Sequence, residues 1–525
     1  MPRSYRFVLT MLGLSVILGQ ASGCAVVRRR IQARATARAE ERQVTTPAPG
    51  VVSGEIPTSS AGQVPGPTAE IAYSGAPPPA FGMLAVVAGG VRYLSEDQTI
   101  ALVADSGGRY MRINLRWGVS EARAGELSFN TDNDRKIALI ENAGLRLFPV
   151  LSVGQGWMND NRAGDNSRSY PPDDLSTVWS DQFGYSPSYY NFVFQFFSHY
   201  RGHFDYVVIE NEANSAIFWG GTADEYVRLI KTAYKAIKSA DPDVTVADSG
   251  FVSTVWGLCI AEDYLRTGLL PRDQVVEMMI AYYSAETSNL RIQSAADLDR
   301  TLEDARIQEQ CRRVNVMLGN MGGSVDAINF HFYEDYRVMR YVVDWIRLRT
   351  QRAGYAPGVI THEIGQRGPD AAFAAGEAHA RAVFKKLITG LSLGLEGMVW
   401  FSADTIGTRA PSPDKLGLFG DGGSIRPAAR TFKLVAETLG AGYRFKTALA
   451  SGPSLFHYVF EDAGNAPSLE AVWTEGGGQT LSLAAPPGRT QAEVTDYAGR
   501  AQTLAVSNGS VQLTLGDAPV FVAWR

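Results

Sequence analysis

Two glutamates follow apolar runs that lie far apart in the sequence. Glu212 comes three residues after the run 204–209, and Glu363 comes two residues after the run 358–361. If both runs are parallel strands of one barrel, their carboxyl ends open on the same side and the two carboxylates share one space. Such a pair is the equipment for cleaving a glycosidic bond, because one group protonates the departing oxygen while the other attacks or stabilises the sugar cation. A strand-end glutamate can also cap a helix or pair with an arginine.

The elements that would position this pair alternate between strand and helix. Short apolar runs predict strands over 110–115, 145–153, 204–209, 244–247, 325–330, 358–361 and 397–401. Helical patterns separate them over 133–143, from Thr222 to Asp241, over 338–351 and over 371–389. This alternation predicts a (β/α)8 TIM barrel over residues 81–438, and no GxGxxG motif follows the first strand to favour a dinucleotide fold. The long segment 250–323 is expected to form one wall of the cleft.

The pattern changes after residue 438. Short strands at hairpin spacing are predicted over 457–461, 469–474, 480–483, 492–495, 501–506, 511–515 and 520–524, with a tight turn at Asn508 and Gly509. The sequence therefore predicts a small antiparallel β-sandwich over 439–525.

Five segments resemble, in order, the motifs of clan A glycoside hydrolases. The segment 204–214 resembles the strand-four motif, in which an asparagine (here Asn211) precedes the acid/base glutamate, and 361–365 resembles the strand-seven motif, whose glutamate is the nucleophile. The other similarities are Arg112, Asn114 and Trp117 in strand two, 326–333 in strand six, and 397–401 in strand eight. The appended sandwich resembles family 39 and its relatives. Ala213 departs from the pattern, which usually has proline there.

The resemblance implies that Glu212 is the acid/base and Glu363 the nucleophile of a retaining hydrolase, and the neighbouring residues fit these roles. Arg112 is a fixed cation that can keep Glu363 ionised, and the Tyr333 hydroxyl can donate to the same carboxylate. Asn211 can offer its amide to a sugar hydroxyl. A buried ion pair for Arg112 and a core phenol for Tyr333 are the alternatives. His331 is either a hydrogen-bond partner in the site or a structural residue.

Four tryptophans are candidates for sugar subsites because they fall at or shortly after strand ends: Trp117, Trp157, Trp219 and Trp400. Flat aromatic faces suit the apolar faces of pyranose rings, although a tryptophan is more often a core residue. Trp400 is the strongest of the four, since it matches the strand-eight motif. Glu210 is expected to point away from Asn211, toward a helix.

The N-terminus has the pattern of an export signal. Arg3 and Arg6 precede an apolar run over 7–18, and small residues lead to Cys24. This resembles a bacterial lipoprotein signal over 1–24, in which Cys24 becomes lipidated; an ordinary signal peptide cut near Ala21 is the alternative. Residues 25–80 are predicted to be a flexible tether that precedes the barrel.

Composition excludes other classes of protein. The net charge of −5 gives no basis for nucleic-acid binding, and we expect no metal site from the six histidines, of which only His199 and His203 lie four residues apart. Three cysteines exclude a disulfide scaffold; Cys259 and Cys311 are expected to form one bridge after export, with two buried thiols as the alternative.

The sequence thus indicates an exported, membrane-anchored retaining glycoside hydrolase that acts on a polysaccharide as a monomer, without cofactor or metal. Two alternatives stay open. One is a carbohydrate-binding lipoprotein that keeps the barrel without turnover, and the other is a lipoprotein scaffold of an envelope machine.

Overall fold

The structure is a computed structural model that describes residues 80–84, 94–162, 168–175, 177–178, 184–283, 290–368, 370–403, 417–440, 442–449, 454–462, 464 and 467–525. All of these residues belong to one compact unit, Pro67–Arg525. The predicted export signal, Cys24 and the tether up to residue 79 lie outside the described residues.

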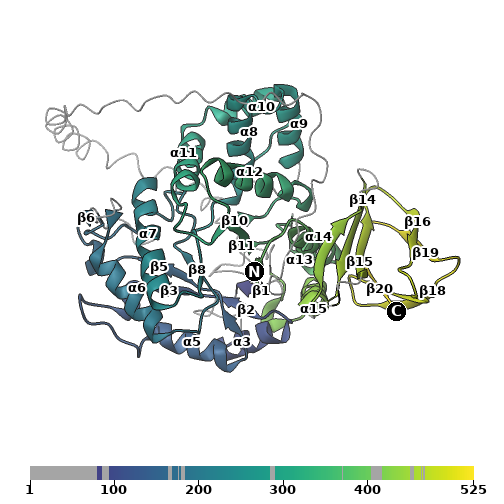
Figure 1. The fold of residues 1–525 in the computed structure, drawn as a ribbon, viewed down its shortest axis with the longest axis horizontal. Coiled ribbons are helices and arrows are strands. Elements are labelled where there is room, and N and C mark those ends of the chain that lie inside the picture. Colours follow the sequence, from purple (N-terminus) through teal and green to yellow (C-terminus); the bar gives the residue numbers. More distant parts are fainter. Residues whose placement is uncertain are drawn as a thin grey trace, which may run out of the picture. The chain divides into compact units, whose positions relative to one another are not determined.

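Eight parallel strands of the described chain close into a barrel (Figure 1). The first, β1 (Ala80–Leu84), pairs with β2 (Tyr110–Arg112) on one side and with the last, β12 (Gly397–Phe401), on the other. The ring continues through β3 (Asn114–Arg116), β4 (Arg146–Leu147), β5 (Val150–Ser152), β8 (Tyr206–Ile209), β9 (Thr245–Ala247), β10 (Ala327–Phe332) and β11 (Gly358–Ile364). β2 with β3, and β4 with β5, are the halves of two interrupted strands. The predicted (β/α)8 class is confirmed.

The interruptions differ from the predicted strands for a physical reason. The run 145–153 divides into β4 and β5 because Phe148 and Pro149 intervene, and a proline has no N–H to donate to a ladder. The Phe148 ring instead joins an apolar plug inside the barrel. The sequence analysis also named no strand before residue 110, whereas β1 closes the ring.

The plug fills the amino-terminal part of the barrel interior. Its buried members come from every part of the ring: Ala80, Phe148, Val150, Tyr206, Val208, Ala247, Ala327, Ile360 and Val399. Because side chains alternate along a strand, inward residues beyond this layer face the carboxyl-terminal mouth. The polar residues of the candidate site occupy those positions.

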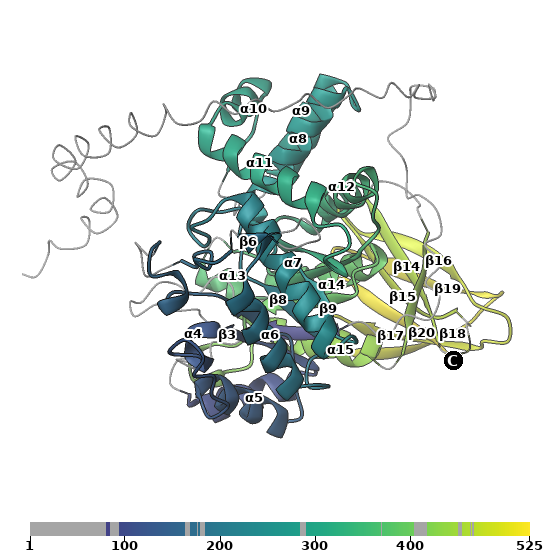
Figure 2. The ribbon, with the colours of Figure 1, turned by 60° about the vertical axis from the view of Figure 1, so that its left-hand side comes forward.

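Helices follow the strands and cover the barrel from outside (Figures 1 and 2). They are α3 (Glu96–Asp105), α4 (Trp117–Ser120), α5 (Asp132–Asn142), α6 (Pro187–His199), α7 (Ala223–Ala240), α12 (Met339–Arg352), α13 (Ala371–Ala375), α14 (Glu377–Ser392) and α15 (Pro427–Gly440). α7 begins as predicted, since the Thr222 hydroxyl accepts the Glu225 N–H at 3.1 Å and the Glu225 carboxylate accepts the Thr222 N–H at 2.8 Å. Within the described part of the chain, no helix is both long and apolar enough to cross a bilayer.

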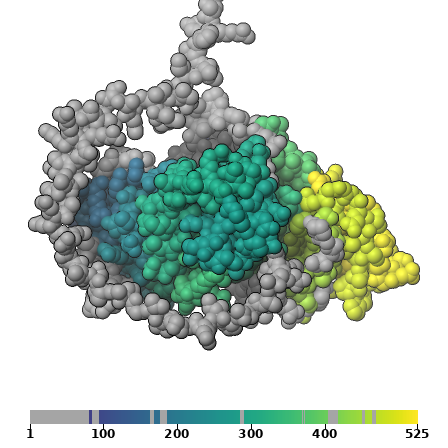
Figure 3. All heavy atoms as spheres, turned by 90° about the horizontal axis from the view of Figure 1, so that it is seen from above, coloured from purple at the N-terminus to yellow at the C-terminus, as the bar shows by residue number. Residues whose placement is uncertain are grey.

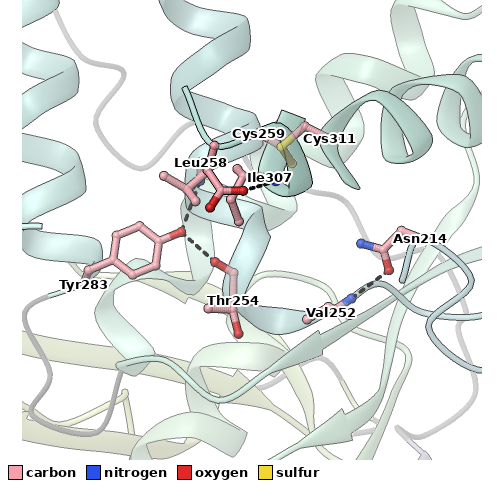
Figure 4. Close-up of a disulfide and its surroundings, with 9 residues drawn as sticks. Asn214, Val252, Thr254, Leu258, Cys259, Tyr283, Ile307 and Cys311 are labelled. Atoms are coloured by element: carbon pink, nitrogen blue, oxygen red, sulfur yellow. Dashed lines mark hydrogen bonds between the residues drawn. A yellow bond between two sulfur atoms is a disulfide. The ribbon is translucent and has the colours of Figure 1, made fainter. Parts of the chain in front are cut away.

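A helical insertion separates β9 from β10. It contains α8 (Trp256–Thr267), α9 (Arg272–Tyr282), α10 (Ala295–Leu302) and α11 (Ala305–Asn320), which group on one side of the barrel in both ribbon views. A disulfide between Cys259 and Cys311 joins α8 to α11, as predicted (Figure 4). Beside it, the Tyr283 hydroxyl donates to Thr254 O at 2.8 Å and accepts the Leu258 N–H at 3.2 Å. The insertion forms a continuous teal to green surface in Figure 3.

The C-terminal part is a sandwich of two antiparallel sheets. One sheet has the order β13 (Arg444–Ala448), β14 (Leu455–Glu461), β15 (Pro467–Thr474), β20 (Val520–Trp524), β17 (Gln491–Asp496) and β18 (Ala501–Ala505). The other pairs β16 (Gln479–Ala484) with β19 (Ser510–Leu515). The predicted turn is present, with positive φ at Asn508 and Gly509. β13 was not predicted.

The sandwich shares its core with the barrel. Trp473 of β15 donates its Nε1–H to the Tyr336 hydroxyl at 3.0 Å, and Phe384 of α14 lies 4.6 Å from Phe521 of β20 between ring centroids. The Lys385 Nζ also donates to Glu475 at 2.6 Å. Buried apolar residues of both parts therefore form one continuous cluster.

Candidate active site

A buried arginine connects two strand ends at the mouth of the barrel. Nη1 of Arg112, at the end of β2, donates to Glu363 Oε2 at 2.7 Å and to the carbonyl of His362 at 3.1 Å. Nη2 donates to Asn211 Oδ1 at 2.8 Å. Removing one partner of such a buried pair would leave an uncompensated charge, at a cost of about 3–5 kcal/mol. Arg112 thus fixes the ends of β8 and β11 relative to each other.

Both oxygens of Glu363 accept hydrogen bonds. Arg112 donates to Oε2 and the Tyr333 hydroxyl donates to Oε1. Burial alone would raise the pKa of Glu363, but the charges of His331 and Arg112, together with these hydrogen bonds, hold it below its usual value. Burial raises the pKa of Tyr333 well above its usual value, and the charge of Glu363 adds to this. Tyr333 therefore remains a hydroxyl donor to an ionised Glu363.

Glu212 lies beside Glu363 and has a different partner. His331 Nδ1 lies 2.8 Å from Glu212 Oε1 and 3.5 Å from Glu363 Oε2. One oxygen of each glutamate and a ring nitrogen of His331 all lie within 4.8 Å of one another. The structure thus brings together six of the predicted site residues: Arg112, Asn211, Glu212, His331, Tyr333 and Glu363.

A backbone turn positions Glu212. Glu210 and Glu212 have positive φ values of 65° and 44°, which non-glycine residues rarely adopt. The Glu212 N–H donates to Ser249 O at 3.0 Å, and the Ala213 N–H donates to Ser249 Oγ at 3.1 Å. These bonds to the segment after β9 hold the turn. Ala213 contributes its backbone N–H to them, which the proline of the family pattern does not have.

Glu210 points into the protein, but its partner differs from the predicted helix. Its Oε1 accepts the Val153 N–H at 2.6 Å, beyond the end of β5. Burial raises the pKa of Glu210 to about 7, against the opposing effect of the hydrogen bonds from Val153 and Ser169. Glu210 therefore ties β8 to the following loop of β5.

The strand-seven end contains an irregularity that aims two consecutive side chains inward. The pairing register of β11 shifts between Thr361 and Ile364 on one side, and that of β10 between Asn329 and His331 on the other. His362 lies over the plug, with Nε2 2.8 Å from Phe148 O. Burial and the charge of Arg112 hold the pKa of His362 well below its usual value, which leaves a neutral structural ring.

Two glycines allow close packing behind the site. Gly250 has a φ of 67°, and a Cβ there would lie 2.5 Å from His331 Nε2. A Cβ on Gly365 would lie 2.5 Å from Phe401 O and 3.0 Å from Tyr333 Cε1. A larger residue at either position would displace a ring that contacts a glutamate.

Three of the four predicted tryptophan platforms are wrong, because their side chains have no exposed surface. Trp117, Trp219 and Trp400 are each 0% exposed. Trp117 stacks on Phe192 at 5.3 Å, Trp219 donates Nε1–H to Thr222 O at 2.9 Å, and Trp400 lies 6.0 Å from His379 of α14. All three belong to the buried apolar core.

Trp157 differs from the other three because its ring is only partly buried. Its Nε1–H donates to Glu121 O at 2.9 Å, and its ring contacts Trp117 edge to face at 5.4 Å. Trp157 therefore has a fixed orientation and remains a candidate platform.

Phe401 takes the place that the sequence analysis gave to Trp400. Its half-buried ring lies 5.5 Å from Tyr333 in a perpendicular arrangement. The alternation of side chains along β12 could have identified Phe401. Val399 belongs to the inner plug, and Phe401, two residues on, faces the same side of the strand. A second missed residue is Arg367, whose guanidinium carbon lies 4.6 Å from the centroid of the Tyr333 ring.

Within the described chain, one group of side chains has ligand atoms close enough together to hold a metal ion: Glu212, His331 and Glu363. However, both oxygens of Glu363 already accept hydrogen bonds, and a guanidinium lies 2.7 Å from one of them. A cation at this point would be repelled by Arg112, so the donor set fits a metal poorly.

The fold resembles solved structures at low sequence identity. A family 39 glycoside hydrolase from Bacteroides cellulosilyticus WH2 matches with a TM-score of 0.55 and 16% identity, over 86% of this chain and 81% of that chain. The catalytic domain of GH30 xylanase C from Talaromyces cellulolyticus matches with a TM-score of 0.52 and 13% identity, over 86% and 99%. A monomeric β-xylosidase from Caulobacter crescentus CB15 matches with a TM-score of 0.50 and 14% identity, over 86% and 97%.

No protein-family model matches the chain, and the comparison with curated proteins finds no match. At these identities the structural likeness shows the fold: a TIM-like barrel followed by antiparallel sheets, shared with clan A glycoside hydrolases.

Proposed function

We propose that the protein is a retaining glycoside hydrolase with Glu212 as acid/base and Glu363 as nucleophile. One observation carries the proposal: two carboxylates at the mouth of the barrel have oxygens within 4.8 Å of each other, in different surroundings. Retaining enzymes place their carboxyl groups about 5–5.5 Å apart, whereas inverting enzymes leave about 6.5–9.5 Å for a water. The fold shared with clan A structures supports the same proposal.

In the first step an oxygen of Glu363 attacks the anomeric carbon while the glycosidic bond breaks. Glu212 transfers its proton to the departing oxygen. Tyr333 and Arg112 position Glu363 by hydrogen bonds to its two oxygens. Since the Oδ1 of Asn211 accepts from Arg112, its Nδ2 is the part of the amide that remains for the sugar 2-hydroxyl.

In the second step the glycosyl ester at Glu363 is hydrolysed. Glu212, now deprotonated, removes a proton from the attacking water, the bond from the sugar to Glu363 breaks, and both glutamates return to their initial state. His331 touches both carboxyl groups, so it can maintain the hydrogen bond to Glu212 through both steps.

The proposed substrate is a polysaccharide outside the cytoplasm. The export pattern and Cys24 in the sequence support a lipid-anchored location, and xylanase and β-xylosidase activities of fold neighbours support a glycan substrate. Mass spectrometry of the native N-terminus is expected to show a diacylated Cys24. An N-terminus cut near Ala21, or an unmodified Cys24, would remove the anchor from the proposal.

The test is hydrolysis of defined polysaccharides by the chain without its first 24 residues, with Glu363→Gln as the inactive control. We expect products whose anomeric configuration, followed by NMR during the reaction, is initially that of the substrate bond. Inverted product would exclude the double displacement, and equal activity of Glu363→Gln would exclude the assigned nucleophile.

A further inference from the structure

An arginine at the edge of the candidate site has no acidic partner among the residues that the structure describes. Arg367 follows β11 by three residues, is half-buried, and lies over the Tyr333 ring at 4.6 Å. No carboxylate of the described chain lies within ion-pairing distance of its guanidinium. By contrast, Arg381 of α14 also lies over a tyrosine, Tyr497, at 5.8 Å, but it pairs with Asp517 at 3.2 Å.

Three acidic side chains of the described chain near Arg367 interact with other cations, and the charge of the buried Glu334 acts on Lys386. Glu363 pairs with Arg112 at 2.7 Å, and Asp335 pairs with Arg337 at 2.7 Å. The buried Lys386 donates its Nζ–H to Gly365 O. The positive charge of Arg367 is therefore a surplus at the rim of the site, next to the residue that holds Glu363.

The contact of Arg367 with the Tyr333 ring is one of charge with ring and does not use its N–H donors. A guanidinium over an aromatic ring uses its face for the contact, while its N–H donors lie in the plane and point outward. That edge matches the two oxygens of a carboxylate or sulfate. Because Tyr333 touches Glu363 at its other end, an anionic substituent bound here belongs to a sugar in or next to the reacting subsite.

A second arginine resembles Arg367 only in its lack of an acidic partner within the described chain. Arg116 ends β3, is exposed, and likewise has no acidic partner among the residues that the structure describes. A guanidinium that no carboxylate of the described chain compensates thus lies at or just beyond the carboxyl end of each of two strands, β3 and β11. This arrangement suits a polymer that carries repeated negative charges better than a neutral one.

We infer that the substrate is an anionic polysaccharide and that Arg367 recognises its carboxylate or sulfate group. The inference rests on the proposed hydrolase function and specifies its substrate class. Arg367 is accordingly a specificity-determining residue rather than part of the acid/base machinery.

The experiment measures kcat/KM for the chain without its first 24 residues on glucuronoxylan, hyaluronan and chondroitin sulfate, each beside its carboxyl-reduced derivative, and on desulfated chondroitin. The variants are Arg367→Gln, Arg367→Lys and the matched control Arg381→Gln. On a cleaved anionic polymer, Arg367→Gln should lower kcat/KM about 10- to 100-fold, as expected for a lost hydrogen bond to a charged group. Its effect on the neutralised derivative should stay within about twofold, and Arg381→Gln should match the wild type on both.

The outcomes separate the two proposals. If carboxyl reduction abolishes the effect of Arg367→Gln, the recognised group is the uronate, and if desulfation abolishes it, the group is the sulfate. Cleavage of neutral glycans alone, or equal losses on charged and neutralised polymers, would overturn the inference and leave the hydrolase function standing. No Glu363-dependent cleavage of any glycan, including neutral xylan and β-glucan, would overturn the hydrolase function and the inference with it.

Discussion

The ends of β8 and β11 carry the same side chain in contrasting surroundings. Glu363 lies within β11 at its register shift, is hydrogen-bonded at both oxygens, and lies 2.7 Å from a guanidinium. Glu212 lies on a turn with positive φ and contacts the imidazole of His331. The comparison shows how a barrel gives two identical carboxyl groups different surroundings: Arg112 and two hydrogen bonds favour the ionised form of Glu363, whereas Glu212 contacts a histidine.

The backbone reinforces this division. The position of Glu363 follows from strand pairing with β10, where His331 is its register partner. The position of Glu212 instead depends on bonds from the turn to Ser249, which compensate backbone conformations that cost about 1–3 kcal/mol each. The proposed nucleophile is thus held by the sheet, and the proposed acid/base by a loop that the sheet supports.

The largest effect is expected from removing the compensated carboxylate. Glu363→Gln keeps the shape of the side chain but removes the attacking oxyanion, so we expect kcat on every substrate to fall by about 10⁴-fold or more. Steady-state kinetics with a natural polysaccharide and an activated aryl glycoside measure the loss. Residual activity within tenfold of the wild type on either substrate contradicts the assignment.

Glu212→Ala should lower kcat on the natural substrate by about 10²–10⁴-fold, the usual contribution of a general acid. An aryl glycoside with a good leaving group needs no proton, so its first step should survive and a burst of phenol should precede slow turnover. Added azide, which needs no deprotonation, should restore turnover.

The matched control for this rescue is Glu363→Ala. Azide should yield a glycosyl azide of retained configuration with Glu212→Ala and of inverted configuration with Glu363→Ala, as read by NMR. The reverse pattern would exchange the two roles.

A smaller effect, visible in the pH profile, is expected from Tyr333→Phe. The Tyr333 hydroxyl favours the ionised form of Glu363, so its loss should raise the pKa of that carboxyl and move the acidic limb of kcat/KM to higher pH. Near the optimum the loss should be about tenfold. An acidic limb that does not move would show that Arg112 and His331 alone keep Glu363 ionised.

Sequence patterns predicted the parts of the barrel that repeat. Apolar runs located most strands, the capping box of Thr222 and Glu225 located the start of α7, and strand-end polar residues located the six clustered side chains. The disulfide between Cys259 and Cys311 was also predicted, with two thiols as the alternative.

The errors arose where side-chain direction matters more than residue type. An indole at a strand end suggested a sugar platform, yet Trp400 faces α14 while the neighbouring Phe401 faces Tyr333. The division of 145–153 at Pro149 and the bulge at β11 depend on pairing partners that no local pattern reveals. Arg367 carried no motif, since its significance lies in the absence of a nearby carboxylate within the described structure.

The smallest effect on catalysis is expected from a substitution at Trp400. It tests whether the direction of a side chain on β12, rather than its residue type, decides if it contributes to the site around Glu363. Trp400→Phe shortens a ring that is 0% exposed and packs against His379, so it should lower the free energy of unfolding by about 1–3 kcal/mol and leave KM unchanged. Phe401→Ala is the matched variant one residue on. It removes the ring that lies 5.5 Å from Tyr333, and KM should rise several-fold as Tyr333 loses its support. Chemical denaturation and steady-state kinetics on both variants distinguish the two positions: if Trp400→Phe raised KM and Phe401→Ala did not, the indole would belong to the site and the orientation of β12 described above would be wrong.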